Sequence, residues 1–130
     1  MIMKVFKTMT VLVASVMLLC SCSHKCSVES VNANEFEHQI HSRQVQLVDV
    51  RTLEEYASGH IVNAINIDVQ KNDFPQEASK RLKKNVPTYV YCRSGKRSME
   101  AADILCKEGY QVVNLRGGIK EWCEAGLPTI

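Results

Sequence analysis

The sequence lacks the features that mark several common classes of protein. It has six cysteines but no Cys-x-x-Cys pair, so neither a zinc site nor a thioredoxin-like redox centre is indicated. His24, His38 and His41 have no ligand-like spacing relative to any pair of cysteines. No internal repeat or low-complexity segment is present. From these absences we predict that the protein holds no metal ion.

A long hydrophobic run is also missing. The longest apolar stretch, Met9–Leu19, is shorter than the roughly 20 apolar residues that a transmembrane helix requires. Lys4 and Lys7 precede it, and a charged segment followed by a short apolar one is typical of a signal peptide. We therefore expect residues 1–21 to be a signal peptide and the protein to be exported, with an uncleaved anchor as the less favoured alternative.

The end of this segment resembles a bacterial lipobox, in which a small residue precedes the cysteine that becomes acylated. Cys22 fits, because Ser21 is small and Leu19 lies three residues before it. Cys20 fits badly, because Leu19 directly precedes it. The resemblance implies a lipid anchor at Cys22, a tether over residues 22–27, and a place in the periplasm or cell envelope. Ordinary signal cleavage, which releases a soluble exported protein, is the alternative.

An excess of charge of one sign is absent once the signal peptide is removed. The whole chain has 16 lysines and arginines against 14 aspartates and glutamates. Lys4 and Lys7 are the only charged side chains in residues 1–21, so their removal leaves fourteen charges of each sign. A neutral chain offers no broad basic surface, and we predict no nucleic-acid partner.

The remaining residues, 28–130, suffice for one core and predict one α/β domain. Short β-branched runs alternate with helical patterns, which is typical of βα units that form a parallel sheet covered by helices. We expect strands over residues 27–31, 45–50, 64–67, 88–91 and 112–115, and helices over residues 34–41, 53–58, 75–82, 98–108 and 118–124.

One cysteine lies where such a sheet places its ligands. Cys92 directly follows the apolar strand Tyr89–Tyr91, and ligands bind beyond the carboxyl ends of parallel strands. The loop Arg93–Ser98 must turn from strand to helix within a few residues, and Gly95 supplies the backbone freedom for that turn. Its N–H groups can then converge on an anion. A helix start and nearby cations lower a thiol's pKa, so we predict that Cys92 is a nucleophile.

Three segments together resemble the rhodanese, or thiosulfate sulfurtransferase, family. The Cys-x-x-Gly-x-Arg pattern from Cys92 to Arg97 is similar to its active-site loop. Two further stretches resemble its N-terminal and C-terminal signatures: Leu47–Arg51 with Glu54–Tyr56, Gly59–Ile61, Ala64 and Asn66–Ile67, and Leu115–Ile119 with Trp122 and Ala125–Pro128. The resemblance covers residues 28–130 and implies a rhodanese-like α/β fold, an about five-stranded, mostly parallel sheet with helices on both faces.

The resemblance also implies a reaction. A Cys92 persulfide would take sulfane sulfur from thiosulfate or a similar small anionic donor and pass it to a thiol or cyanide acceptor, with no cofactor and as a monomer. Arg51 and the loop residues Arg93, Ser94, Gly95, Lys96 and Arg97 would bind substrate. The choice between Arg93 and Arg97 as the main contact stays open. Asp49 would be structural support, and we expect Glu55 and His60 to be structural as well.

Alternatives remain open for the function. A related phosphatase branch has five residues between its cysteine and arginine, whereas four separate Cys92 from Arg97, so sulfur transfer is favoured over phosphate hydrolysis. A non-catalytic persulfide carrier or partner-binding module is the second alternative. Asp68 stands where the family often has proline, and we expect the loop of residues 69–74 to border the pocket.

The remaining cysteines outside the signal segment leave their pairing open. Cys26, Cys106 and Cys123 could form a disulfide in an oxidising compartment, but spacing alone does not give connectivity. We expect Cys106 and Cys123 to be small packing residues, with a Cys106–Cys123 bridge as the alternative.

Overall fold

The computed structural model describes residues 26–130. The predicted signal peptide, the proposed lipidation site at Cys22 and residues 22–25 of the predicted tether lie outside the described residues. Within the described part of the chain, no helix combines the length and apolar character that crossing a membrane would need.

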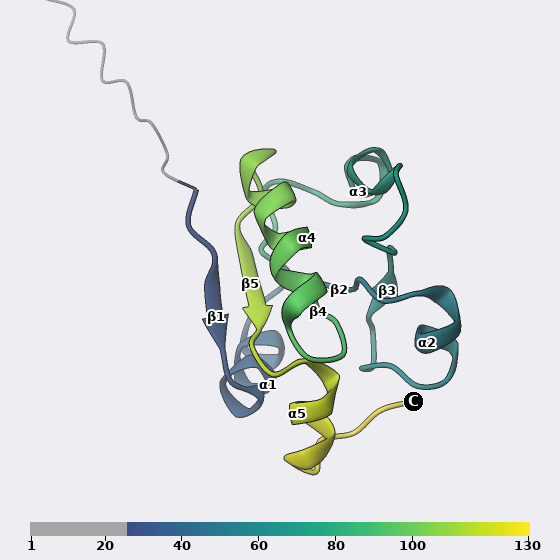
Figure 1. The fold of residues 1–130 in the computed structure, drawn as a ribbon. Coiled ribbons are helices and arrows are strands. Elements are labelled where there is room, and N and C mark those ends of the chain that lie inside the picture. Colours follow the sequence, from purple (N-terminus) through teal and green to yellow (C-terminus); the bar gives the residue numbers. More distant parts are fainter. Residues whose placement is uncertain (1–25) are drawn as a thin grey trace, which may run out of the picture.

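A five-stranded sheet forms the centre of the domain (Figure 1). Its strands are β1 (Glu29–Val31), β2 (Gln46–Asp49), β3 (Ile65–Asn66), β4 (Thr88–Tyr91) and β5 (Val112–Leu115), in the spatial order β1-β5-β4-β2-β3. Every neighbouring pair is parallel. Strand β4 lies at the centre of the sheet and is buried along its whole length, including the polar Thr88.

Helices cover both faces of this sheet. They are α1 (Ala33–Ser42), α2 (Leu53–Ala57), α3 (Phe74–Arg81), α4 (Lys96–Lys107) and α5 (Gly118–Glu124). Residues of α3 and α4 form one core cluster with Val48 and Val90, whereas residues of α1 and α5 form a second cluster with Tyr89 and Tyr91. The predicted α/β fold with a helix layer on each face is confirmed.

Local sequence signals account for several helix starts. The Asn32 side chain accepts a hydrogen bond from the Glu35 amide at 2.9 Å and caps α1. Thr52 and Glu55 form a reciprocal capping box at α2. In contrast, α4 begins at Lys96, two residues earlier than predicted, because Gly95 takes a left-handed conformation with φ 99° and turns the chain at once into the helix.

A disulfide joins Cys26 to Cys106, 80 residues apart in the sequence, with their Cα atoms 5.6 Å apart. Cys106 packs against the core cluster of α4, as expected, but it is also a disulfide partner. The expectation that Cys123 is a small packing residue is wrong, because its side chain is exposed. The alternative Cys106–Cys123 bridge is also wrong, because Cys123 is a free thiol. The bond fastens the last residues of the predicted tether to the C-terminal turn of α4.

Candidate active site

Cys92 lies at the junction between β4 and α4, as the sequence predicts. Its side chain is 1% exposed and faces the α3–α4 side of the sheet. The Gly95 amide donates to Cys92 Sγ at 3.1 Å, and the buried Ser98 hydroxyl donates to it at 3.3 Å. The loop is thus closed around the sulfur atom itself.

These donors stabilise the thiolate. Burial alone would disfavour the charged form, but hydrogen bonds from the Ser98 hydroxyl and from the amides of Ser98, Gly95 and Ser94 outweigh burial and lower the pKa of Cys92. The predicted activation of the thiol is therefore present in the geometry. Its main source is the set of loop donors, and the neighbouring cations are not among the leading causes.

Two glycines let neighbouring segments approach this loop. A Cβ at Gly95 would overlap the carbonyl oxygen of Arg116, and a Cβ at Gly118 would overlap that of Arg93. The first turn of α5 also bonds to the loop: the Ile119 amide donates to the Cys92 carbonyl at 2.9 Å. Sequence reasoning assigned only the turn to Gly95, whereas the structure adds close packing between two backbones.

Arg97 is held by a carboxylate. Its guanidinium donates to both carboxylate oxygens of Glu55, at 2.7 and 2.9 Å. This bidentate contact lowers the pKa of Glu55 to about 2 despite the opposing effect of its partial burial. The same contact is the main cause of the raised pKa of Arg97, and the charge on the nearby Cys92 raises that pKa further. The pair joins α2 to α4, so the expected structural role of Glu55 includes bracing the candidate site.

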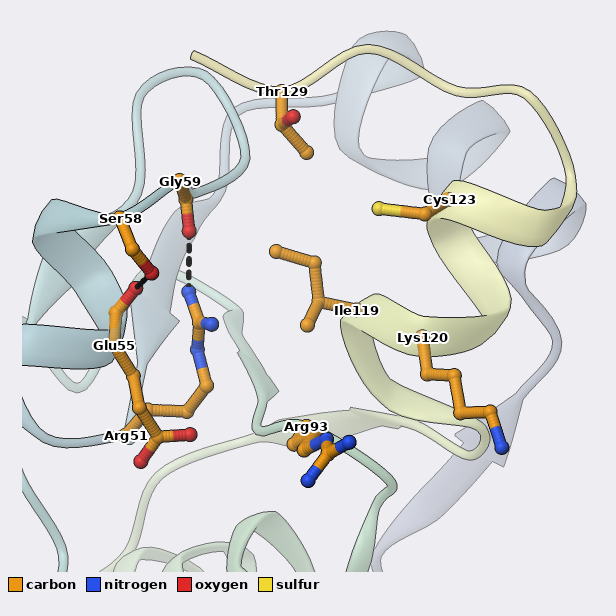
Figure 2. A pocket seen from close by; sticks show the side chains of 9 residues that line it. All are labelled: Arg51, Glu55, Ser58, Gly59, Arg93, Ile119, Lys120, Cys123 and Thr129. Carbon is orange, nitrogen blue, oxygen red and sulfur yellow. Dashed lines mark hydrogen bonds between the residues drawn. The ribbon is translucent and has the colours of Figure 1, made fainter.

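Asp49 and Arg51 form a buried ion pair, with Arg51 Nη2 at 2.6 Å from Asp49 Oδ2. The same nitrogen donates to the Gly59 carbonyl at 2.7 Å (Figure 2). This geometry agrees with the expected supporting role for Asp49. Arg51 is bound on two sides, although it also lines a cavity.

That cavity, of about 510 Å³, opens beside the Cys92 loop (Figure 2). Its lining combines residues of the N-terminal signature, the loop and the C-terminal helix: Arg51, Glu55, Ser58, Gly59, Arg93, Ile119, Lys120, Cys123 and Thr129. Among the predicted substrate-binding residues, Arg93 and Arg51 line it, whereas Ser94 is exposed on the loop and Lys96 is exposed at the first turn of α4. The structure therefore favours Arg93 over Arg97 as the cation open to a ligand.

Two parts of the surroundings differ from expectation. The predicted border of the pocket, residues 69–74, instead contributes Lys71, Asp73 and Phe74 to a separate hollow with Asn66 and Arg81. Lys120 and Cys123 were missed as lining residues. They lie three residues apart in α5, and a helix with that spacing places both on neighbouring positions, but the sequence does not say which cavity they face.

We predict that replacing Ser98 by alanine moves the thiol's reactivity to higher pH. The hydroxyl favours the thiolate, so its loss raises the pKa of Cys92 and lowers the alkylation rate near pH 7 by about tenfold. The measurement is the rate at which iodoacetamide alkylates Cys92, followed by peptide mapping as a function of pH so that the exposed Cys123 is counted separately. Ser94→Ala is the matched control, because Ser94 contributes its backbone amide, which the substitution keeps. Identical pH profiles for the two variants would contradict the assignment.

Comparison with known proteins gives the family. The model of the rhodanese-like domain matches residues 32–125, and the chain belongs to this family. A sulfurtransferase of Allochromatium vinosum is 40% identical over 90 residues, which is 68% of this chain and 81% of the relative. The thiosulfate sulfurtransferase GlpE of Coxiella burnetii is 34% identical over 91 residues, covering 69% of this chain and 81% of the relative.

Solved structures agree with the fold. A rhodanese-related protein from Thermoplasma volcanium has a TM-score of 0.69 at 32% identity, covering 78% of this chain and 97% of that one. A rhodanese-like domain protein from Staphylococcus aureus has a TM-score of 0.65 at 35% identity, covering 72% and 90%. The domain therefore has a sulfurtransferase type of function.

Proposed function

We propose that the protein moves sulfane sulfur from thiosulfate, or a similar anionic donor, to a thiol or cyanide acceptor through a persulfide on Cys92. The observation that carries this proposal is the convergence of the Gly95 amide and the Ser98 hydroxyl on Cys92 Sγ. Donors so placed stabilise a negative sulfur, both as the attacking thiolate and as a terminal persulfide anion.

The reaction proceeds by two displacements at sulfur. The Cys92 thiolate attacks the outer sulfur of thiosulfate, the S–S bond of the donor breaks, and sulfite leaves with the electron pair. An acceptor thiolate then attacks the terminal sulfur of the Cys92 persulfide, the bond between the two sulfurs breaks, and the Cys92 thiolate returns. No electrons are gained or lost overall, and the kinetics are expected to be ping-pong.

The exposed cations give the donor a place to approach. Arg93 lines the cavity beside the loop, and Lys96 is exposed at the first turn of α4. Both raise the local concentration of a dianion and stabilise the charge that develops on leaving sulfite. Arg97 acts indirectly in this proposal, because Glu55 already holds its guanidinium.

We also propose that the protein is exported and lipid-anchored at Cys22. The charged and apolar segments before Cys22 support the proposal. The Cys26–Cys106 disulfide independently supports export, though not the lipid anchor, since structural disulfides persist mainly in oxidising compartments.

Intact-mass spectrometry after incubation with thiosulfate tests the sulfur chemistry. We expect a gain of one sulfur atom, located on Cys92 by peptide mapping and removed by cyanide with formation of thiocyanate. A persulfide that forms on Cys92 but is not discharged by cyanide or by a small thiol would favour the carrier alternative. Absence of the adduct together with rapid hydrolysis of an aryl phosphate would overturn the proposal in favour of the phosphatase branch.

A further inference from the structure

The cavity beside the catalytic loop contains a second thiol that sulfur transfer from Cys92 does not use. Cys123 is exposed, unlike Cys92, and its sulfur points from α5 into the hollow near Ile119 and Thr129 (Figure 2). The volume of about 510 Å³ is in the range of small-molecule sites. The thiol is therefore the reactive group of a preformed hollow with room for a ligand.

Ion pairing decides which charges of the cavity are open to a ligand. Arg51 is neutralised by Asp49, and Glu55 is neutralised by Arg97. Arg93 and Lys120 also line the cavity, and neither has a carboxylate partner among the described residues. The charge left for a ligand is positive.

The remaining wall is small or apolar. Ile119 lies one helical turn before Cys123 on α5, and both side chains face the hollow (Figure 2). The neighbouring Glu124 is not part of the lining. A ligand that fits this arrangement has a sulfur for Cys123, a short apolar middle, and a carboxylate for Arg93. Lys120, whose side chain points away from Cys123, adds positive charge at the edge of the cavity (Figure 2).

We propose that this cavity binds small carboxylate-bearing disulfides and that Cys123 captures half of each as a mixed disulfide. The Cys123 thiolate attacks one sulfur of the disulfide, a bond between Cys123 and that sulfur forms, and the disulfide bond of the ligand breaks. The second half leaves as a thiolate with the electron pair, so one disulfide replaces another without an added oxidant. The step is independent of persulfide formation on Cys92.

Exchange rates of the Cys92→Ser variant test this proposal without interference from the catalytic thiol. The probes are dithiodipropionate, which carries two carboxylates, and cystamine, which is similar in size but carries two ammonium groups. For each probe, the exchange rate with the protein is divided by the rate at which the same probe reacts with a small neutral thiol. This ratio removes the intrinsic difference in reactivity between the two disulfides. We expect the normalised rate to favour dithiodipropionate by about tenfold at low salt, with the preference shrinking as salt is added.

Variants of single lysines separate the cavity from general surface charge. Lys120→Gln should remove most of the preference, whereas Lys107→Gln, an exposed lysine of α4 outside the cavity lining, should keep it. Peptide mapping should place the adduct on Cys123, and Cys123→Ser should abolish it. Equal normalised rates for the two probes, equal effects of the two lysine variants, or an adduct on another cysteine would overturn the proposal. None of these outcomes depends on whether Cys92 transfers sulfur.

Discussion

Thiosulfate:cyanide sulfur transfer should fall by on the order of a thousandfold or more when Cys92 is replaced by serine. The hydroxyl that replaces the thiol is a far poorer nucleophile at neutral pH and cannot hold a sulfane sulfur. The loop donors remain, since the Gly95 amide belongs to the backbone and Ser98 is unchanged. The loss should therefore appear in turnover and in the persulfide signal together.

The control for this variant is a check that it folds like the wild type. Serine differs from cysteine by one atom, so near-native circular dichroism and a melting midpoint close to that of the wild type are expected. The folded Cys92→Ser protein should also fail to gain sulfur from thiosulfate by intact mass. Turnover that survives in this folded variant would show that the chemistry does not pass through Cys92.

Removing the Cys26–Cys106 disulfide should lower the free energy of unfolding by about 4 kcal/mol. The bond closes a loop of 80 residues, and loops of that length strongly restrict the unfolded chain in the entropic account of disulfide stabilisation. The measurement is urea unfolding of Cys26→Ser, which changes an exposed residue at the start of the described chain. Wild-type protein unfolded in the presence of a reductant should show the same loss.

Cys123→Ser is the matched control for stability, because it removes an exposed cysteine outside the disulfide. Its free energy of unfolding should stay within about 0.5 kcal/mol of the wild type. Reductant should no longer affect Cys26→Ser, since the bond is already absent. If Cys26→Ser unfolds at the wild-type urea concentration, the disulfide has no stabilising role in the folded chain.

The sheet and the reactive loop were predictable because their signals are local. Buried β-branched runs indicated the strands, and the pattern from Cys92 to Arg97 placed a thiol at a strand end. Thr52 could be identified as a cap from its type and position, whereas the sequence offered both Asn32 and Asn34 for the first helix and the structure shows that Asn32 is its cap. Each of these inferences depends on residues that are close together in the chain.

Contacts between distant residues were not predictable in the same way. The partner of Cys106 is 80 residues away, and nothing in the spacing separates Cys26 from Cys123 as its partner. Glu55 and Arg97 are 42 residues apart, and only the packing of α2 beside α4 brings them together. The cavity is likewise formed by three separate segments, so its lining by Cys123 and Lys120 emerged only from the tertiary structure.

Helix α4 separates the covalent cross-link from the chemistry. Lys96 opens the helix next to the sulfur-binding loop, while Cys106 lies near its far end, which at 1.5 Å per residue is a distance of about 15 Å. The disulfide thus joins the segment before β1 to the end of α4 that is remote from Cys92. A load applied through the N-terminus therefore acts on the disulfide and the far end of α4, and the Cys92 loop at the other end of the helix is spared.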